Sequence, residues 1–140
     1  MATAQEYHDK LEKLTNEIGS TSYDIGTVQE AKAALADVRI RQKELRQVKR
    51  DINFDLKQIR TEYKAKAETA GSGGSLLFSV LGSRGSARSH RASARRGVRA
   101  ERDRMLKPYE QAKSVIDELI LALDKAKLQI QNFIDEEKAR

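Results

Sequence analysis

The chain has 140 residues, a formal net charge of +6, no cysteine, no tryptophan and a single proline. This length is enough for one domain, and the absence of cysteine excludes disulfides and cysteine-ligated zinc sites. Charged residues make up 34% of the chain and aromatic residues 5%. That composition is typical of long solvated helices rather than of a thick globular core, so it predicts an all-α fold.

A first helix is predicted over residues 4–18. Thr3 and Glu6 have the spacing of a capping box, in which each side chain satisfies a free backbone donor. Gly19 suits the left-handed position that ends many helices. One face of this helix carries apolar residues at steps of four, three and four: Tyr7, Leu11, Leu14 and Ile18.

Two longer helices are predicted over residues 27–69 and 98–138, because their apolar residues alternate steps of three and four. A sustained repeat of 3.5 residues indicates a helix that faces another helix along its length. The polar residues Gln42 and Lys49 interrupt the first repeat. The predicted seam between the two helices consists of Leu35, Val38, Leu45, Ile52, Leu56, Ile59, Met105, Tyr109, Ile116, Leu119, Leu123, Ile130 and Phe133.

The two repeats match when the helices are laid antiparallel. Ile59 then lies opposite Met105, and the polar Lys49 and Gln42 lie opposite Ile116 and Leu123. The sequence therefore predicts a long antiparallel coiled-coil hairpin, with the helix of residues 4–18 packed near its base as a third helix. Residues 70–97 are predicted to form a flexible apex that is apolar and then basic.

The excess positive charge lies in one segment, because residues 84–107 hold nine basic and two acidic residues. Arginines take the place of apolar residues at seam positions, in phase with the heptads of the following helix. Such a face cannot be buried against another helix without a large desolvation cost, so it is expected to meet anions. The candidate anion-binding residues are Arg84, Arg88, Arg91, Arg95, Arg96, Arg99 and Arg102.

A compact apolar cluster comes just before the arginines and is expected to make contacts at the apex: Leu76, Leu77, Phe78, Val80 and Leu81. Three interpretations remain open. In the first, the cluster folds back on the hairpin or packs against another protein. In the second, it inserts into a membrane while the arginines bind anionic lipid. In the third, the arginines contact the backbone of a nucleic acid.

The run SLLFSVLGSRGSARSHRASARRGVRAERDR, residues 75–104, resembles the apex segment between the coiled-coil arms of some bacterial HerA-type ATPases. The resemblance implies a hairpin that serves as a docking module. It does not imply ATPase activity, because the chain has no GxxxxGK[ST] phosphate-binding loop.

The sequence predicts a non-enzymatic protein, because it shows no constellation of acid, base and nucleophile. His8 and His90 lie apart and form neither a catalytic nor a metal-binding motif, so no cofactor and no metal are expected. The predicted function is a scaffold or adaptor that acts through protein contacts or self-association, with an anionic membrane or nucleic acid as alternative partners. No small-molecule substrate is expected. The first residues lack the features of a signal peptide, so the expected location is the cytoplasm, with peripheral membrane association left open.

Overall fold

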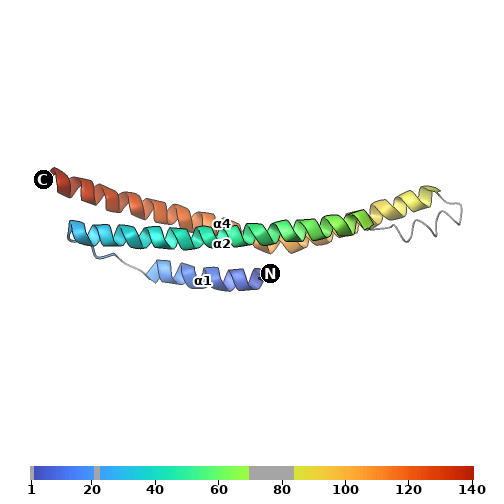
Figure 1. Cartoon of the computed structure of the whole chain (residues 1–140), viewed down its shortest axis with the longest axis horizontal. Coiled ribbons are helices and arrows are strands. Elements are labelled where there is room, and N and C mark those ends of the chain that lie inside the picture. Colours follow the sequence, from blue (N-terminus) through green and yellow to red (C-terminus); the bar gives the residue numbers. More distant parts are fainter. Residues whose placement is uncertain (1, 21–22, 70–83) are drawn as a thin grey trace. The chain divides into compact units, whose positions relative to one another are not determined.

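The computed structural model describes residues 2–20, 23–69 and 84–140. Nearly all of these residues belong to three helices, α1 (Ala4–Ser20), α2 (Val28–Thr69) and α4 (Arg84–Ala139), which are drawn in Figure 1. The described ranges contain no strand. The predicted all-α class is therefore confirmed.

Capping side chains explain where α1 and α2 begin. At α1, Thr3 Oγ1 accepts a hydrogen bond from the Glu6 amide at 3.2 Å, and the Glu6 carboxylate accepts one from the Thr3 amide at 3.1 Å. At α2, Thr27 Oγ1 accepts from the Glu30 amide at 3.1 Å, but the Glu30 carboxylate bonds to the Gly26 amide at 3.2 Å. Both caps satisfy amides that have no partner inside the helix.

The ends of two helices differ from the prediction. α1 continues through Gly19 to Ser20, and Gly19 does not adopt the left-handed conformation expected of it. α4 begins at Arg84 rather than at residue 98, so residues 84–97 are helical where the sequence predicted a flexible apex. The alanines and arginines of this stretch have high helix propensity, which outweighs its two glycines. α4 is also continuous through Pro108.

The chain divides into two compact units. The first unit is formed by Met1–Asn53 with Glu110–Arg140 and the second by Phe54–Tyr109. The first unit therefore contains α1, residues 28–53 of α2 and residues 110–139 of α4. The described residues of the second unit are 54–69 of α2 and 84–109 of α4.

Each unit buries an apolar stripe between α2 and α4. In the first unit, Val38, Leu45, Ile52 and Ile116 are fully buried, and α1 adds Tyr7 and Leu11. A lone helix cannot bury Leu11 to 2% exposure, so other elements of this unit cover one face of α1. In the second unit, the buried residues are Leu56, Ile59, Tyr63, Leu106 and Tyr109.

Three predicted seam residues of α4 are not fully buried. Met105 is 46% exposed and its neighbour Leu106 is buried instead. Phe133 is half-buried beside the buried Ile134, and Leu119 is half-buried. A straight helix drifts by about 20° per heptad relative to a strict 3.5-residue repeat, and this drift moves burial from one residue to its neighbour. The other predicted seam residues are buried, as the sequence indicated.

Candidate functional site

Polar contacts join α2 to α4 inside the first unit. Gln42 is 1% exposed, and its Nε2 donates to Asp124 Oδ1 at 2.6 Å and to the Ile120 carbonyl at 3.4 Å. One heptad further along α2, Lys49 Nζ lies 2.6 Å from Asp117 Oδ1. As residue numbers rise along α2, the contacted residue numbers fall along α4.

These two contacts differ from the predicted pairing by one residue. The sequence placed Gln42 opposite Leu123 and Lys49 opposite Ile116, whereas each side chain contacts the aspartate that follows. Sequence reasoning missed Asp117 and Asp124, although these two residues are seven positions apart, as are their partners on α2. A buried polar contact in a helix seam favours one alignment over others, because a shifted alignment leaves the amide without a partner.

A second polar cluster anchors the segment between α1 and α2. The Tyr23 hydroxyl donates to Asp37 Oδ2 at 2.6 Å, and Arg41 Nε donates to the same oxygen at 3.0 Å. Burial raises the pKa of Tyr23, and the hydrogen bond to Asp37 adds to this effect. The hydrogen bonds from Tyr23 and then Arg41 lower the pKa of Asp37. The carboxylate thus stays charged and holds the segment to α2.

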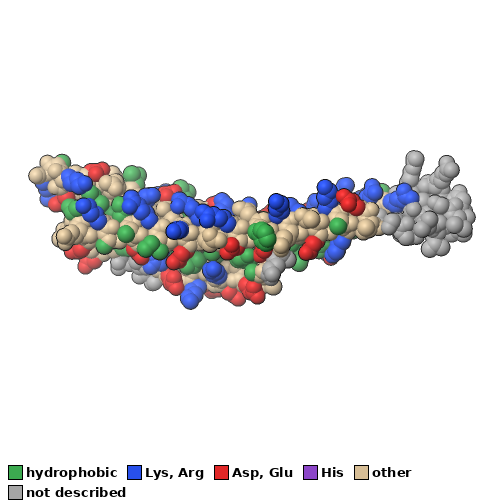
Figure 2. All heavy atoms as spheres, viewed as in Figure 1, with side chains coloured by type: hydrophobic (Ala, Val, Ile, Leu, Met, Phe, Trp, Pro, Cys, Tyr) green, Lys and Arg blue, Asp and Glu red, His purple; other side chains and the backbone are tan. Residues whose placement is uncertain are grey.

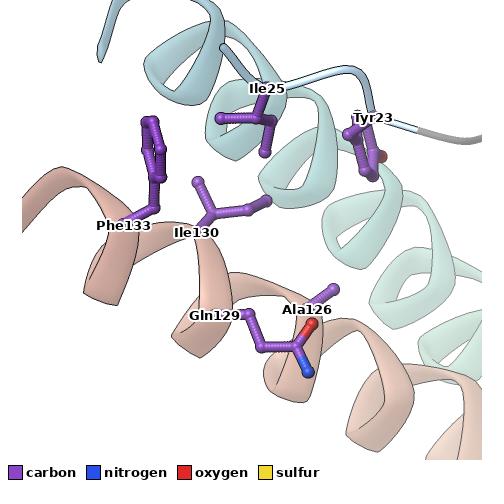
Figure 3. A pocket seen from close by; sticks show the side chains of 6 residues that line it. All are labelled: Tyr23, Ile25, Ala126, Gln129, Ile130 and Phe133. Atoms are coloured by element: carbon purple, nitrogen blue, oxygen red, sulfur yellow. The ribbon is translucent and has the colours of Figure 1, made fainter. Parts of the chain in front are cut away.

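A cavity of about 340 Å³ lies between this anchored segment and the end of α4. Figure 3 shows Tyr23 and Ile25 on one side and the side chains of α4 on the other. Its lining is mostly apolar and contains no charged residue: Tyr23, Ile25, Ala126, Gln129, Ile130 and Phe133. The one hydroxyl group of this lining belongs to Tyr23, and it donates to Asp37.

In the second unit, most of the candidate arginines whose side chains the structure describes are exposed on α4. Arg91, Arg95, Arg96 and Arg99 are exposed, and Arg102 is half-buried. The half-buried residues of this stretch are otherwise small: Ala92, Ala94 and Val98. The sequence indicated that a face carrying these arginines would not be buried against another helix, and Arg91 and Arg95 are exposed. Arg84 and Arg88 lie at the start of α4.

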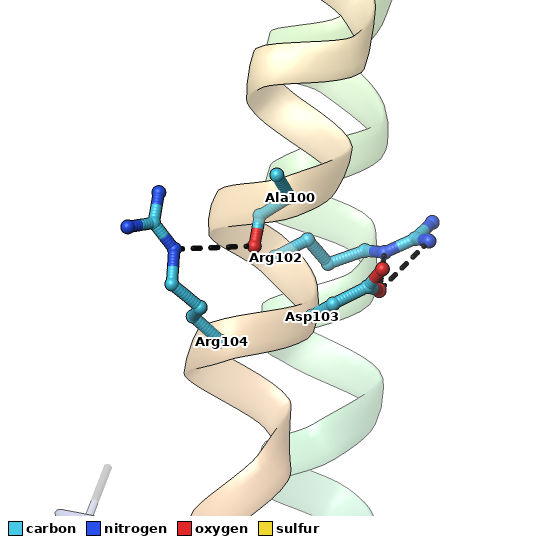
Figure 4. Close-up of polar contacts among 4 residues, drawn as sticks. All are labelled: Ala100, Arg102, Asp103 and Arg104. Carbon is cyan, nitrogen blue, oxygen red and sulfur yellow. Dashed lines mark hydrogen bonds and ion pairs between the residues drawn. The ribbon is translucent and has the colours of Figure 1, made fainter.

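Two arginines near the seam point to different sides of α4 (Figure 4). Arg102 Nε and Nη2 donate to Asp103 Oδ1 at 3.2 and 3.1 Å. Arg104 Nε donates to the Ala100 carbonyl at 3.4 Å on the other side of the helix. The positive charge of α4 is thus split between two faces.

Tyr63 is the central polar contact of the second unit. Its hydroxyl donates to Glu101 Oε1 at 3.2 Å, and Lys66 Nζ lies 4.6 Å from the centre of its ring. Burial raises the pKa of Tyr63, and the hydrogen bond to Glu101 adds to this effect. Glu62 and Arg104 also act on the hydroxyl through their charges. The acidic residues near Tyr63 therefore gather at its hydroxyl end.

A cleft of about 350 Å³ lies beside the Tyr63 side chain in the second unit. We call it the basic cleft. Its lining contains two cations from each helix and no acidic residue: Arg60, Tyr63, Lys64 and Ala67 of α2, and Val98, Arg99 and Arg102 of α4. Figure 2 shows Lys and Arg side chains on the displayed surface of this part of the chain.

Sequence reasoning missed the α2 side of the basic cleft. Arg60 and Lys64 were absent from the predicted anion-binding set, whose members all lie in α4. The signal was present, because Lys57, Arg60 and Lys64 follow one another at steps of three and four beside the seam. Combined with the antiparallel alignment, this spacing would have placed them next to the arginines of α4.

Other predicted features give no site in the described residues. The apolar cluster of residues 76–81 lies outside the described residues. Among residues 2–20, 23–69 and 84–140, no group of three or more His, Asp or Glu side chains could hold a metal ion. No helix of the same residues has both the length and the apolar character needed to cross a membrane.

Comparisons with known proteins found no relative of this chain. No family model matches it, and neither the curated proteins nor the solved structures contain a significant match. The resemblance of residues 75–104 to HerA-type ATPases therefore stays a prediction.

Proposed function

We propose that this chain is a non-enzymatic scaffold or adaptor, built on an antiparallel coiled-coil hairpin and acting in the cytoplasm through protein–protein contacts. The observation that carries the proposal is the pair of contacts Gln42–Asp124 and Lys49–Asp117. The contacts are spaced by seven residues on both helices, and the residue numbers rise along α2 while they fall along α4. An antiparallel coiled-coil hairpin produces this pattern. Rigid paired helices of this kind serve as supports for binding surfaces.

Exposed leucines on α4 support the self-association part of the proposal. Leu121 and Leu128 are 56% and 63% exposed, and they stand one heptad apart on the same face. Two such leucines on a further coiled-coil face favour a helix from a second copy of this chain as the neighbour.

Cross-linking tests the hairpin, because a chain without cysteine can carry a single engineered pair. Lys49→Cys with Asp117→Cys should link rapidly within one chain through a short bifunctional maleimide. Lys49→Cys with Leu128→Cys is the matched control and should link slowly. Links that form only between chains would contradict the hairpin.

Light scattering during size-exclusion chromatography tests self-association. We expect an oligomer for the wild-type chain and a shift toward the monomer for Leu121→Ser with Leu128→Ser. A wild-type chain that stays monomeric at all concentrations would contradict self-association through these leucines.

A second candidate function is binding of an anionic partner by the arginines of α4. The observation that favours it is that Arg91, Arg95, Arg96 and Arg99 are exposed on one helix. The guanidinium groups of Arg95, Arg96 and Arg99 can donate to phosphate or carboxylate groups of a partner. Co-sedimentation with anionic vesicles and mobility shifts with nucleic acid test this function. Arg91→Ser with Arg95→Ser and Arg96→Ser should weaken binding strongly.

A further inference from the structure

The two long helices of the first unit carry opposite net charges. Residues 28–53 of α2 include seven basic and four acidic side chains, whereas residues 110–139 of α4 include four basic and seven acidic ones. Charge is therefore separated between the helices of this unit. A second copy of the chain offers each helix a surface of the opposite sign, and such complementarity steers association.

Four cations form a row on the exposed side of α2. They follow one another at steps of four, three and four, and we call this row the basic face: Arg39, Lys43, Arg46 and Arg50. Side chains three or four residues apart are neighbours on a helix, and none of the neighbours of these four cations is acidic. Because like charges at this spacing repel, the row is unfavourable within its own helix.

Acids elsewhere in the chain do not neutralise the basic face. None of its four cations forms an ion pair among the described residues, and Arg50 Nη1 donates to the neutral Gln47 side chain at 3.2 Å. Across the seam, the two aspartates of α4 that contact α2 are held by Lys49 and Gln42. Every Asp and Glu of the chain lies within the described residues. The row is therefore open to the acids of a partner.

The exposed side of α4 combines leucines with acids. Leu121 and Leu128 are 56% and 63% exposed, and three exposed carboxylates lie three, four or seven residues from a leucine. We call this surface the leucine face: Glu118, Leu121, Asp124, Leu128 and Asp135. Neutral amides donate to two of these carboxylates, and none of the three forms an ion pair among the described residues. Lys125 lies close to both leucines in the helix, but the three acids leave the face with a negative excess.

We propose that the leucine face of one copy docks on the basic face of a second copy. The inference rests on the self-association part of the proposed function and assigns the surface that receives the leucines. The two faces match in length, because residues 118–128 cover about 15 Å and residues 39–50 about 16 Å at 1.5 Å per residue. The aliphatic stems of lysine and arginine cover the leucines while their charged ends reach the acids beside them.

A symmetric contact of leucine face against leucine face is less favourable. It would bring the acids of one copy next to the same acids of the other, and like charges at neighbouring positions repel. Docking of unlike faces leaves one basic face and one leucine face unused in every pair. Association should therefore continue into a ring or an open chain of copies.

Two variants each destroy one face and keep the other. Lys43→Glu with Arg46→Glu reverses the charge of the basic face, and Leu121→Ser with Leu128→Ser removes the leucines. Light scattering during size-exclusion chromatography should find each variant monomeric on its own. An equimolar mixture should form pairs with one copy of each variant, because the intact leucine face of the first meets the intact basic face of the second.

The matched control is Lys10→Glu with Lys13→Glu on α1, which makes the same charge change at the same spacing on exposed residues. It should associate like the wild type. Arg39→Gln with Arg50→Gln is a milder change of the basic face and should raise the dissociation constant about tenfold. High salt should weaken association of the wild type. Circular dichroism should show the helix content of the wild type in every variant.

The outcomes separate this inference from self-association itself. If the basic-face variant associates like the wild type while the leucine variant is monomeric, the basic face is overturned and leucine contacts between copies remain. Two monomeric variants whose mixture stays monomeric would overturn the contact between unlike faces. An equal loss of association in the α1 control would overturn it as well, since the effect would then be one of general charge. A wild-type chain that is monomeric at all concentrations would overturn both the inference and self-association.

Discussion

Lys49 on α2 meets Asp117 on α4 in the first unit, so the charges that face each other across the seam attract. In the second unit, Lys64 on α2 lines a cleft with Arg99 on α4, and the charges repel. The two units use the same pair of helices and the same heptad spacing. The first unit thus pairs opposite charges across the seam at this point, whereas the lining of the basic cleft in the second unit brings like charges together.

Burial differs along α4 rather than between the units as wholes. Leu56 and Ile59 of the second unit are as fully buried as Leu45 of the first, while Ala94 and Val98 of α4 are only half-buried. Small side chains bury little apolar area and contribute little to stability. We therefore expect substitutions of the large buried residues to have larger effects on stability than substitutions in residues 91–98 of α4.

Leu45→Ala should have the largest effect on stability. The loss of a fully buried leucine and the cavity left behind should lower the free energy of unfolding by roughly 2–5 kcal/mol. Ile40→Ala, at a residue that is 57% exposed, should change it by less than about 0.5 kcal/mol. Urea unfolding followed by circular dichroism measures both. Similar losses for the two variants would contradict the assigned core.

Asp124→Ala should come next, because it removes the shorter of the two hydrogen bonds that the buried Gln42 amide donates. We expect a loss of about 1–3 kcal/mol in the free energy of unfolding. Asp117→Ala removes the partner of Lys49 at the solvent-exposed edge of the seam, and it should cost about 1 kcal/mol or less. If Asp117→Ala proves the more harmful change in urea unfolding, the role of the buried contact is wrong.

Tyr23→Phe should lower stability at neutral pH by about 0.5–1.5 kcal/mol, because the hydrogen bond to Asp37 is lost. The folded pKa of Asp37 lies below 3.8, so its contribution is present above that pH and disappears as the pH falls through the lowered value. The folded pKa of Tyr23 lies above 10.0, so its contribution is present below that pH and disappears as the pH rises through the raised value.

Unfolding measured at a series of pH values checks the Tyr23 prediction. The difference between wild type and Tyr23→Phe should shrink at both pH extremes. With Asp37→Asn, the change at acidic pH should vanish. A difference that stays constant from acid to alkali would rule out the contact between Tyr23 and Asp37.

Arg99→Glu should have the smallest effect on stability and the opposite sign. It replaces repulsion across the basic cleft by attraction to Lys64, which should stabilise the chain by about 0.2–1 kcal/mol at low salt. High salt should reduce the gain, because the charges are partly in water. Arg104→Glu is the control and should destabilise, since Glu62 and Glu101 also act on the Tyr63 hydroxyl. Thermal unfolding at two salt concentrations measures both variants. Melting temperatures that shift in the same direction in the two variants would contradict the prediction.

The long helices and most of the seam could be predicted from the sequence, because the periodicity of the apolar residues alone determines which face is buried. Ile52, Leu56 and Ile116 were predicted in this way, and they are buried. Met105 was assigned wrongly because periodicity cannot distinguish neighbours when the helix drifts from a strict heptad. The contacts to Asp117 and Asp124 could not be predicted, because they depend on how far polar side chains reach across the seam.

The basic cleft was harder to predict. The arginines of α4 stand out in the composition, but Arg60 and Lys64 lie among acidic residues such as Glu62, so α2 shows no local excess of charge. Only the pairing of the two helices separates the basic side from the side where Glu62 and Glu101 meet the Tyr63 hydroxyl. A linear sequence does not display this separation until the helices are placed together.

The seven-residue spacing of Gln42 and Lys49 restricts which insertions and deletions the first unit can accept. One added residue between them would rotate Lys49 by about 100° around α2 and shift it by 1.5 Å or so. Lys49 would then leave Asp117, and the apolar residues that follow would turn toward solvent. Length variants of this region should therefore survive only when whole heptads are gained or lost in both helices together, and a folded variant with a single inserted residue there would contradict this constraint.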